Sequence, residues 1–87
     1  MAPDIPVCFL APGGGLGHLV RSTALALELI DLGVETSILS SSPYSAGMAR
    51  ITGLNIQQIS LTDWATQIPQ ILSSNPPRIL VTDTFPS

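Results

Sequence analysis

A glycine-rich segment near the amino terminus, residues 12–21 (PGGGLGHLVR), holds the groups with the clearest chemical potential in this sequence. Its glycines permit positive φ and leave no Cβ in the path of a phosphate, so their backbone amides could approach an anion. His18 and Arg21 lie three residues apart and would share one face of a helix that starts here. The segment therefore offers backbone donors, a titratable imidazole and a fixed cation, which suit phosphate binding and proton transfer. The glycines are Gly13, Gly14, Gly15 and Gly17.

The elements that position this segment are predicted from hydrophobic patterning. A continuous apolar run is typical of a parallel strand covered on both faces, and the periodic segment after the glycines is typical of a helix. The same reasoning gives strands at 7–11, 35–39, 54–61 and 78–83, and helices at 16–32, 43–51 and 64–72. Pro69 is expected to kink or split the third helix. The alternation predicts an α/β fold, a Rossmann-like parallel sheet of four strands in the order 3-2-1-4 with flanking helices.

This strand order reverses between the first and fourth strands, and ligands of such sheets bind beyond the carboxyl ends of the strands at the reversal. His18 follows the first strand, and Asp83 and Thr84 stand where the fourth strand ends. Two interpretations stay open. His18 could be a general base that activates an acceptor hydroxyl, with Asp83 orienting the imidazole. Alternatively, His18 only bonds to its own loop and Asp83 caps the next element.

A run of serines at 40–42 follows the second strand. Ser41 could line an acceptor pocket, or the serines could serve only as loop and cap residues, with Ser42 capping the second helix. Thr62 or Asp63 is expected to cap the third helix. The residues predicted to contact substrate or its phosphates are Gly13, Gly14, Gly15, Gly17, Arg21, Ser41 and Thr84.

Several familiar motifs are excluded by details of the sequence. The dinucleotide fingerprint would need a glycine where His18 stands, and serines occupy the place of the acidic residue that should end the second strand. A P-loop needs a lysine, and the sequence has none. No cluster of histidine, cysteine and carboxylates has metal-ligand spacing, and no G-x-S-x-G segment presents a nucleophilic serine. Neither a metal site nor a cofactor is therefore expected.

The composition is apolar and weakly charged. Of the 87 residues, 45% are hydrophobic and 10% are charged, and the net charge is −3. Small domains expose proportionally more surface, so this balance favours a piece of a larger protein. Three arginines without a lysine make no basic patch, which argues against a nucleic-acid partner. A single cysteine, the lack of a transmembrane segment and the lack of a basic signal-peptide region favour a cytoplasmic protein.

Two segments of the sequence together resemble a known enzyme family. Residues 13–21 (GGGLGHLVR) look like the first loop and helix of GT-B glycosyltransferases, closest to the MurG-like and predicted-glycosyltransferase group. Residues 81–86 (VTDTFP) resemble the DxFP segment at the end of the fourth strand in that group. The resemblance implies transfer of a sugar from a nucleotide-sugar donor to an acceptor hydroxyl, with His18 as base and Asp83 as its partner. The nucleotide sugar would be a substrate rather than a cofactor.

The resemblance also implies what this chain would lack. GT-B enzymes have two Rossmann-like domains, and the second holds most of the donor, whereas these 87 residues correspond to part of the first. The chain is therefore expected to be an N-terminal, acceptor-side fragment that does not transfer sugar by itself. Two other interpretations stay open: a fragment of a nucleotide-sugar hydrolase with a similar loop, and a non-enzymatic remnant or interaction module.

Overall fold

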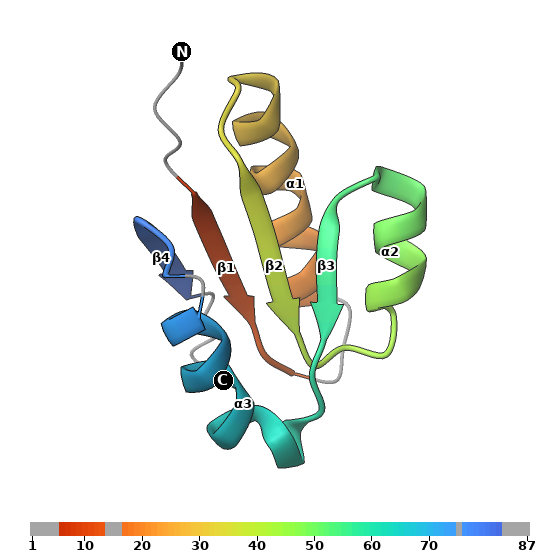
Figure 1. The fold of residues 1–87 in the computed structure, drawn as a ribbon. Coiled ribbons are helices and arrows are strands. Elements are labelled where there is room, and N and C mark those ends of the chain that lie inside the picture. Colours follow the sequence, from red (N-terminus) through yellow and green to blue (C-terminus); the bar gives the residue numbers. More distant parts are fainter. Residues whose placement is uncertain (1–5, 14–16, 75, 83–87) are drawn as a thin grey trace.

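The computed structural model describes residues 6–13, 17–74 and 76–82 (Figure 1). The four strands form one parallel sheet in the order β3-β2-β1-β4. One face of the sheet carries α1 and α2 and the other carries α3 (Figure 1). The predicted α/β fold and its 3-2-1-4 order are therefore confirmed. The elements are β1 (Val7–Ala11), α1 (Gly17–Asp31), β2 (Thr36–Ser40), α2 (Ser45–Thr52), β3 (Asn55–Gln58), α3 (Leu61–Ser74) and β4 (Ile79–Thr82).

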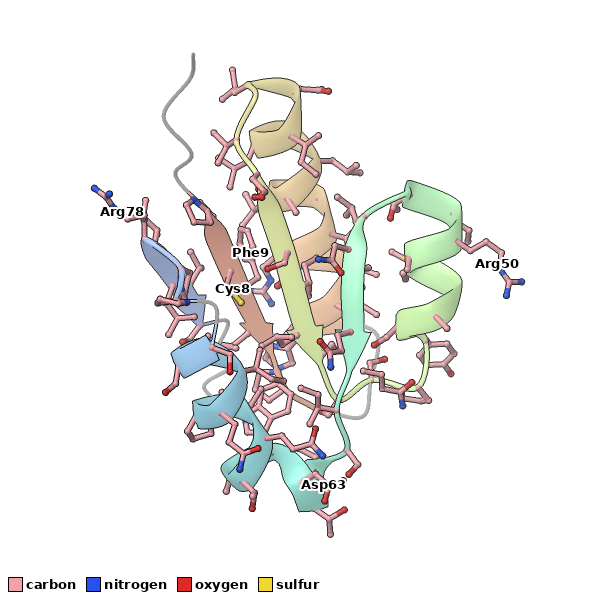
Figure 2. The ribbon with its side chains drawn as sticks, viewed as in Figure 1. Cys8, Phe9, Arg50, Asp63 and Arg78 are labelled. Carbon is pink, nitrogen blue, oxygen red and sulfur yellow. The ribbon has the colours of Figure 1, made fainter. Side chains whose placement is uncertain are left out.

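β1 is the centre of the fold because both of its faces are buried. It has a neighbour on each side, so Phe9 stands opposite Ile38 of β2 and Val81 of β4. Side chains alternate between the faces of a strand. Phe9 therefore packs in the core beneath α1, whereas Cys8 packs in the core beneath α3 (Figure 2). A run of five apolar residues without a polar interruption is what a strand buried on both faces requires.

α1 ends in a hydrogen-bonded cap built on a glycine. Gly33 has φ of +84°, and its N–H donates to the carbonyl of Ile30 at 2.9 Å. The N–H of Val34 donates to the carbonyl of Leu29, also at 2.9 Å. These two bonds form a Schellman motif, which satisfies carbonyls that the last helical turn leaves without a partner. The cap turns the chain back toward the sheet, where β2 begins at Thr36.

α2 begins two residues later than the sequence predicts. The hydroxyl of Ser42 accepts a hydrogen bond from the N–H of Tyr44 at 3.2 Å, and the hydroxyl of Ser45 donates to the Ser42 carbonyl at 2.7 Å. These local bonds hold residues 42–44 in a turn that competes with helix. Ser42 therefore does not cap α2. The residue that precedes the helix is Tyr44, and its side chain makes no cap hydrogen bond.

α3 is one continuous helix, so the prediction that Pro69 splits it is wrong, whereas the alternative that Pro69 kinks it stays a prediction. Proline lacks the N–H that would bond four residues back, but Pro69 is exposed, where water can satisfy the carbonyl left behind. On the buried face, Ile68 packs on the sheet and holds the helix there. The predicted cap is also wrong, because Ser60 closes the first turn: its carbonyl accepts the N–H of Asp63 at 3.0 Å and its hydroxyl donates to that carboxylate at 3.1 Å.

The two edges of the sheet differ in polarity. β3 carries Asn55, Gln57 and Gln58, all exposed, whereas β4 is ILVT with Ile79 and Leu80 half-exposed on opposite faces. β3 is also shorter than predicted, because the chain turns into α3 at Leu61. Within the described ranges, no helix combines the length and apolarity needed to cross a bilayer.

Candidate functional site

The candidate site lies at the carboxyl end of β1, where the glycine-rich segment leads into α1. Gly13 has φ of +121°, a conformation that side-chain-bearing residues rarely adopt. A Cβ placed on Gly13 would lie 3.4 Å from Cδ2 of His18. The imidazole of His18, which is the second residue of α1, therefore lies beside Gly13, where a side chain on residue 13 would touch it. Two residues that the sequence singled out for chemistry lie next to each other.

The end of β2 approaches this loop through a group of buried serines, which we call the serine cluster: Ser40, Ser41, Ser42 and Ser45. Each of the four is at most 8% exposed. Buried hydroxyls are costly unless they form hydrogen bonds. In this cluster every hydroxyl has a partner on the backbone.

Two members of the serine cluster bond to the chain that follows β1. The hydroxyl of Ser41 accepts the N–H of Gly13 at 2.7 Å and donates to the carbonyl of the same residue at 2.9 Å. The hydroxyl of Ser40 donates to the carbonyl of Ala11 at 2.9 Å. The pairing of Ala11 with Ser40 at the ends of β1 and β2 brings these groups together. The start of the glycine-rich segment is therefore fixed by β2 as well as by its own strand.

The N-terminal end of α1 suits an anion. A helix N-terminus carries partial positive charge and N–H groups without helical partners. The first turn of α1 contains no acidic residue that would neutralise this charge. Arg21 is exposed one turn further along. Ser22 is buried on the same helix, and its hydroxyl makes no hydrogen bond with the described part of the chain.

The structure brings together some of the predicted site residues. Gly13, His18 and Ser41 form one contiguous group, and Arg21 stands on the same helix as His18. Gly17 starts α1, and a Cβ there would meet no atom of the described residues within 4 Å, so these residues do not demand a glycine at this position. The remaining predicted residues, Gly14, Gly15, Asp83 and Thr84, lie outside the described residues, and their roles stay predictions.

The end of β4 lies beside the end of β1, as the predicted strand order requires. Leu10 pairs with Thr82, the last described residue of the chain. The loop after β1 and the chain after β4 therefore leave the sheet from neighbouring strands. This is the position at which ligands bind in doubly wound sheets. The proposed partnership of His18 with the residue after Thr82 is thus compatible with the sheet, and it stays a prediction.

A hollow that the sequence does not predict lies away from the candidate site, toward the amino end of the sheet. Its volume is about 300 Å³. One wall is the face of β2 and β3 that carries Ser37, Asn55 and Gln57, and the opposite wall is α3 with a proline-rich turn. The alternation of polar residues on β3 is the only signal in the sequence for this hollow. Its lining residues are Pro6, Val7, Cys8, Glu35, Thr36, Ser37, Ile38, Leu39, Asn55, Gln57, Ile71, Leu72, Pro76 and Pro77.

Cys8 borders this hollow but is almost completely buried. Burial raises the pKa of its thiol above the ordinary value of 9.0, and a hydrogen bond with Ser37 partly opposes that rise. The thiol therefore stays protonated near neutral pH, and it is a poor nucleophile. Cys8 acts as a small core residue at this position.

The sequence did not predict the backbone partners of Ser40 and Ser45, and it predicted only a helix cap for Ser42. A run of serines after a strand signals a turn, but it does not reveal which backbone groups the hydroxyls reach.

Within the described ranges, no three histidine, cysteine or carboxylate side chains lie close enough to hold a metal ion. Comparisons with protein-family models, curated proteins and solved structures found no match to this chain.

Proposed function

We propose that this chain forms the acceptor-side part of a glycosyltransferase that uses a nucleotide-sugar donor. The observation that carries the proposal is the position of His18. It stands in the first turn of α1, against Gly13, at the carboxyl end of the central strand. A general base needs this kind of fixed position near a site that can receive a phosphate-bearing substrate. The likeness of residues 13–21 and 81–86 to GT-B enzymes adds the substrate class.

In the proposed reaction, an acceptor hydroxyl attacks the anomeric carbon of the donor. The oxygen–carbon bond forms while the bond from that carbon to the diphosphate breaks, and the diphosphate leaves with the electron pair. His18 takes the proton from the acceptor hydroxyl. The negative charge that develops on the diphosphate is stabilised by the N-terminal end of α1 and by Arg21. Asp83 orients the imidazole.

The anion-binding half of the proposal is tested with inorganic pyrophosphate as the probe. Because the sequence has one histidine, its imidazole gives a single set of NMR signals, and all of them report on His18. Added pyrophosphate should shift these signals and the amide of Gly17 in a saturable manner, whereas the Gly13 N–H is already bonded to the Ser41 hydroxyl. The substitution Arg21→Gln should weaken binding about tenfold, which corresponds to about 1.4 kcal/mol.

The matched control for this titration is Arg50→Gln. Arg50 is also an exposed arginine on a helix, but it extends from α2 away from the sheet (Figure 2). Both variants change the net charge equally. Equal weakening in the two variants, or no saturable shift in the native sequence, would show that pyrophosphate binds through general charge or not at all.

The catalytic half of the proposal needs the protein at the length the cell produces, which intact-mass measurement establishes first. His18→Ala should then lower turnover by about 10²–10⁴-fold, the usual contribution of a general base. Undiminished turnover would remove His18 from the mechanism. Release of the sugar to water without transfer to an acceptor would replace the transferase by a hydrolase.

A further inference from the structure

We propose that Ser41 is a positioning residue, which holds the imidazole of His18 in place through the backbone of Gly13. The proposal rests on the proposed function for the statement that His18 is the base, whereas the contacts themselves do not depend on it. It also gives Ser41 a role different from the substrate contact expected from the sequence. The inference is built in three steps, from Ser41 to Gly13, from β2 to Ser41, and from Gly13 to His18.

In the first step, Ser41 fixes both sides of one residue. Its hydroxyl accepts the Gly13 N–H at 2.7 Å and donates to the Gly13 carbonyl at 2.9 Å. The two bonds orient the peptide planes before and after Gly13, and these planes define φ and ψ. Gly13 is thereby held at a φ of +121°, which only glycine adopts without strain. The hydroxyl has then used its one proton and an acceptor site.

In the second step, Ser41 is itself held by its surroundings. The residue before it, Ser40, is completely buried and bonds to Ala11 through its hydroxyl. The Ser40 carbonyl accepts the N–H of Ile59 at 2.8 Å, and its hydroxyl accepts the N–H of Ser42 at 3.1 Å. Bonds from three segments therefore fix the backbone on either side of Ser41. A hydroxyl on such a backbone can impose a position on its partner, because it has little freedom to follow a displacement.

In the third step, Gly13 supports the ring. The 3.4 Å distance from the Cβ position of Gly13 to Cδ2 of His18 places the imidazole directly beside this residue, on the side where a Cβ would stand. A peptide rotation at Gly13 would change the surface on which the ring rests. Ser41, which lies 28 residues from Gly13 in the sequence, therefore sets the location of the imidazole through Gly13.

The test compares the histidine NMR signals of Ser41→Ala with those of the native chain. Loss of the hydroxyl releases Gly13, so the His18 Hδ2 and Hε1 signals should move. The matched control is Ser45→Ala, which removes a buried serine hydroxyl that bonds to the Ser42 carbonyl and not to Gly13. Ser41→Thr keeps the hydroxyl and should return the signals toward their native positions. His18 signals that move no further in Ser41→Ala than in Ser45→Ala would overturn the proposal.

Two NMR measurements on the native chain test the proposal even if a variant fails to fold. The Gly13 amide should exchange slowly with solvent, because its N–H is bonded to Ser41, and a nuclear Overhauser effect should join a Gly13 Hα to His18 Hδ2. Rapid exchange at Gly13 together with no such effect would contradict the first and third steps. Neither result depends on pyrophosphate binding or sugar transfer, so failure of the positioning role is distinguishable from failure of the proposed function.

In a protein that transfers sugar, the same variant has a kinetic signature. Displacement of a catalytic group by about 1 Å can cost about 10²-fold in rate. Ser41→Ala should therefore lower kcat by up to that factor while KM changes little, because the hydroxyl does not contact the substrate. A rise in KM with unchanged kcat would instead make Ser41 a substrate-binding residue.

Discussion

The serine cluster at the carboxyl end of the sheet and the carboxamides of β3 differ in how far their polar side chains are buried. At the carboxyl end, the serine cluster is buried, and its hydroxyls bond to backbone groups. On β3, Asn55 and Gln57 are exposed and border a hollow beside α3, although Thr36 at the amino end of β2 is buried and its hydroxyl donates to the Val34 carbonyl at 3.1 Å. A buried hydroxyl that loses its partner pays a desolvation cost, whereas an exposed carboxamide exchanges its partner for water. The carboxyl end therefore has a backbone of fixed geometry, and this is the end at which His18 stands.

The largest effect that would test this comparison is expected at Gly13. In Gly13→Ala, the new Cβ disfavours a φ of +121°, and a relaxed backbone would break both bonds to Ser41. A residue forced into such a region costs about 1–3 kcal/mol. We expect a loss of about 3 kcal/mol in the free energy of unfolding measured with urea, since strain and lost hydrogen bonds add.

The control for this substitution is Gly33→Ala, at the cap of α1. Gly33 also has positive φ, but at +84°, and a Cβ there would meet no atom within 4 Å. Both changes remove the same backbone freedom from the unfolded chain, so that contribution cancels. Gly33→Ala should cost about 1 kcal/mol. Equal costs at the two glycines would mean that the bonds from the serine cluster add nothing to the stability of the carboxyl end.

An intermediate effect is expected from pH at the amino end. The pKa of the Cys8 thiol is raised by burial, so the thiol ionises more readily in the unfolded chain than in the folded one. Its contribution to stability is complete below pH 9.0 and is lost as the pH rises above that value. The free energy of unfolding should fall there by at most about 1.4 kcal/mol per pH unit.

The matched variant for the pH measurement is Cys8→Ala, which lacks the titrating thiol. Its unfolding free energy should be lower than that of the native chain at neutral pH, because a buried side chain is truncated. Its decline above pH 9.0 should be shallower than that of the native chain. If the unfolding free energies of the native chain and Cys8→Ala declined in parallel with pH, the Cys8 thiol would be exposed to water through the hollow and would not be buried as the structure has it.

The smallest effects are expected at the exposed carboxamides of β3. Asn55→Ala and Gln57→Ala should each change the free energy of unfolding by no more than about 0.5 kcal/mol, as is usual for exposed positions. The same urea experiment measures them. A loss above about 1 kcal/mol in either variant would mean that the exposed carboxamides of β3 also hold the fold, and the contrast with the serine cluster would fail.

Much of the fold was predictable because it depends on local patterns and chain handedness. The apolar run at 7–11 has no polar side that could face water, so it had to become a strand covered on both faces. Right-handed crossovers then place the second and fourth strands on opposite sides of the first. The predicted split at Pro69 was wrong, although local propensity argues against a helix there. Packing of Ile68 and its neighbours on the sheet outweighs that local cost.

The candidate site was only partly predictable, for a reason that lies in sequence separation. The glycines, His18 and the start of α1 are neighbours along the chain, so the sequence by itself determined that an imidazole stands at a helix N-terminus after a strand. Only the tertiary structure decided that Ser41 reaches Gly13. The pairing of Ala11 with Ser40 brings together the loops that contain Gly13 and Ser41, which are 28 residues apart. The residue type serine does not predict which backbone group its hydroxyl will bond to. Local conformation follows from residue types, whereas a hydrogen bond between distant loops follows from the register of the strands that deliver them.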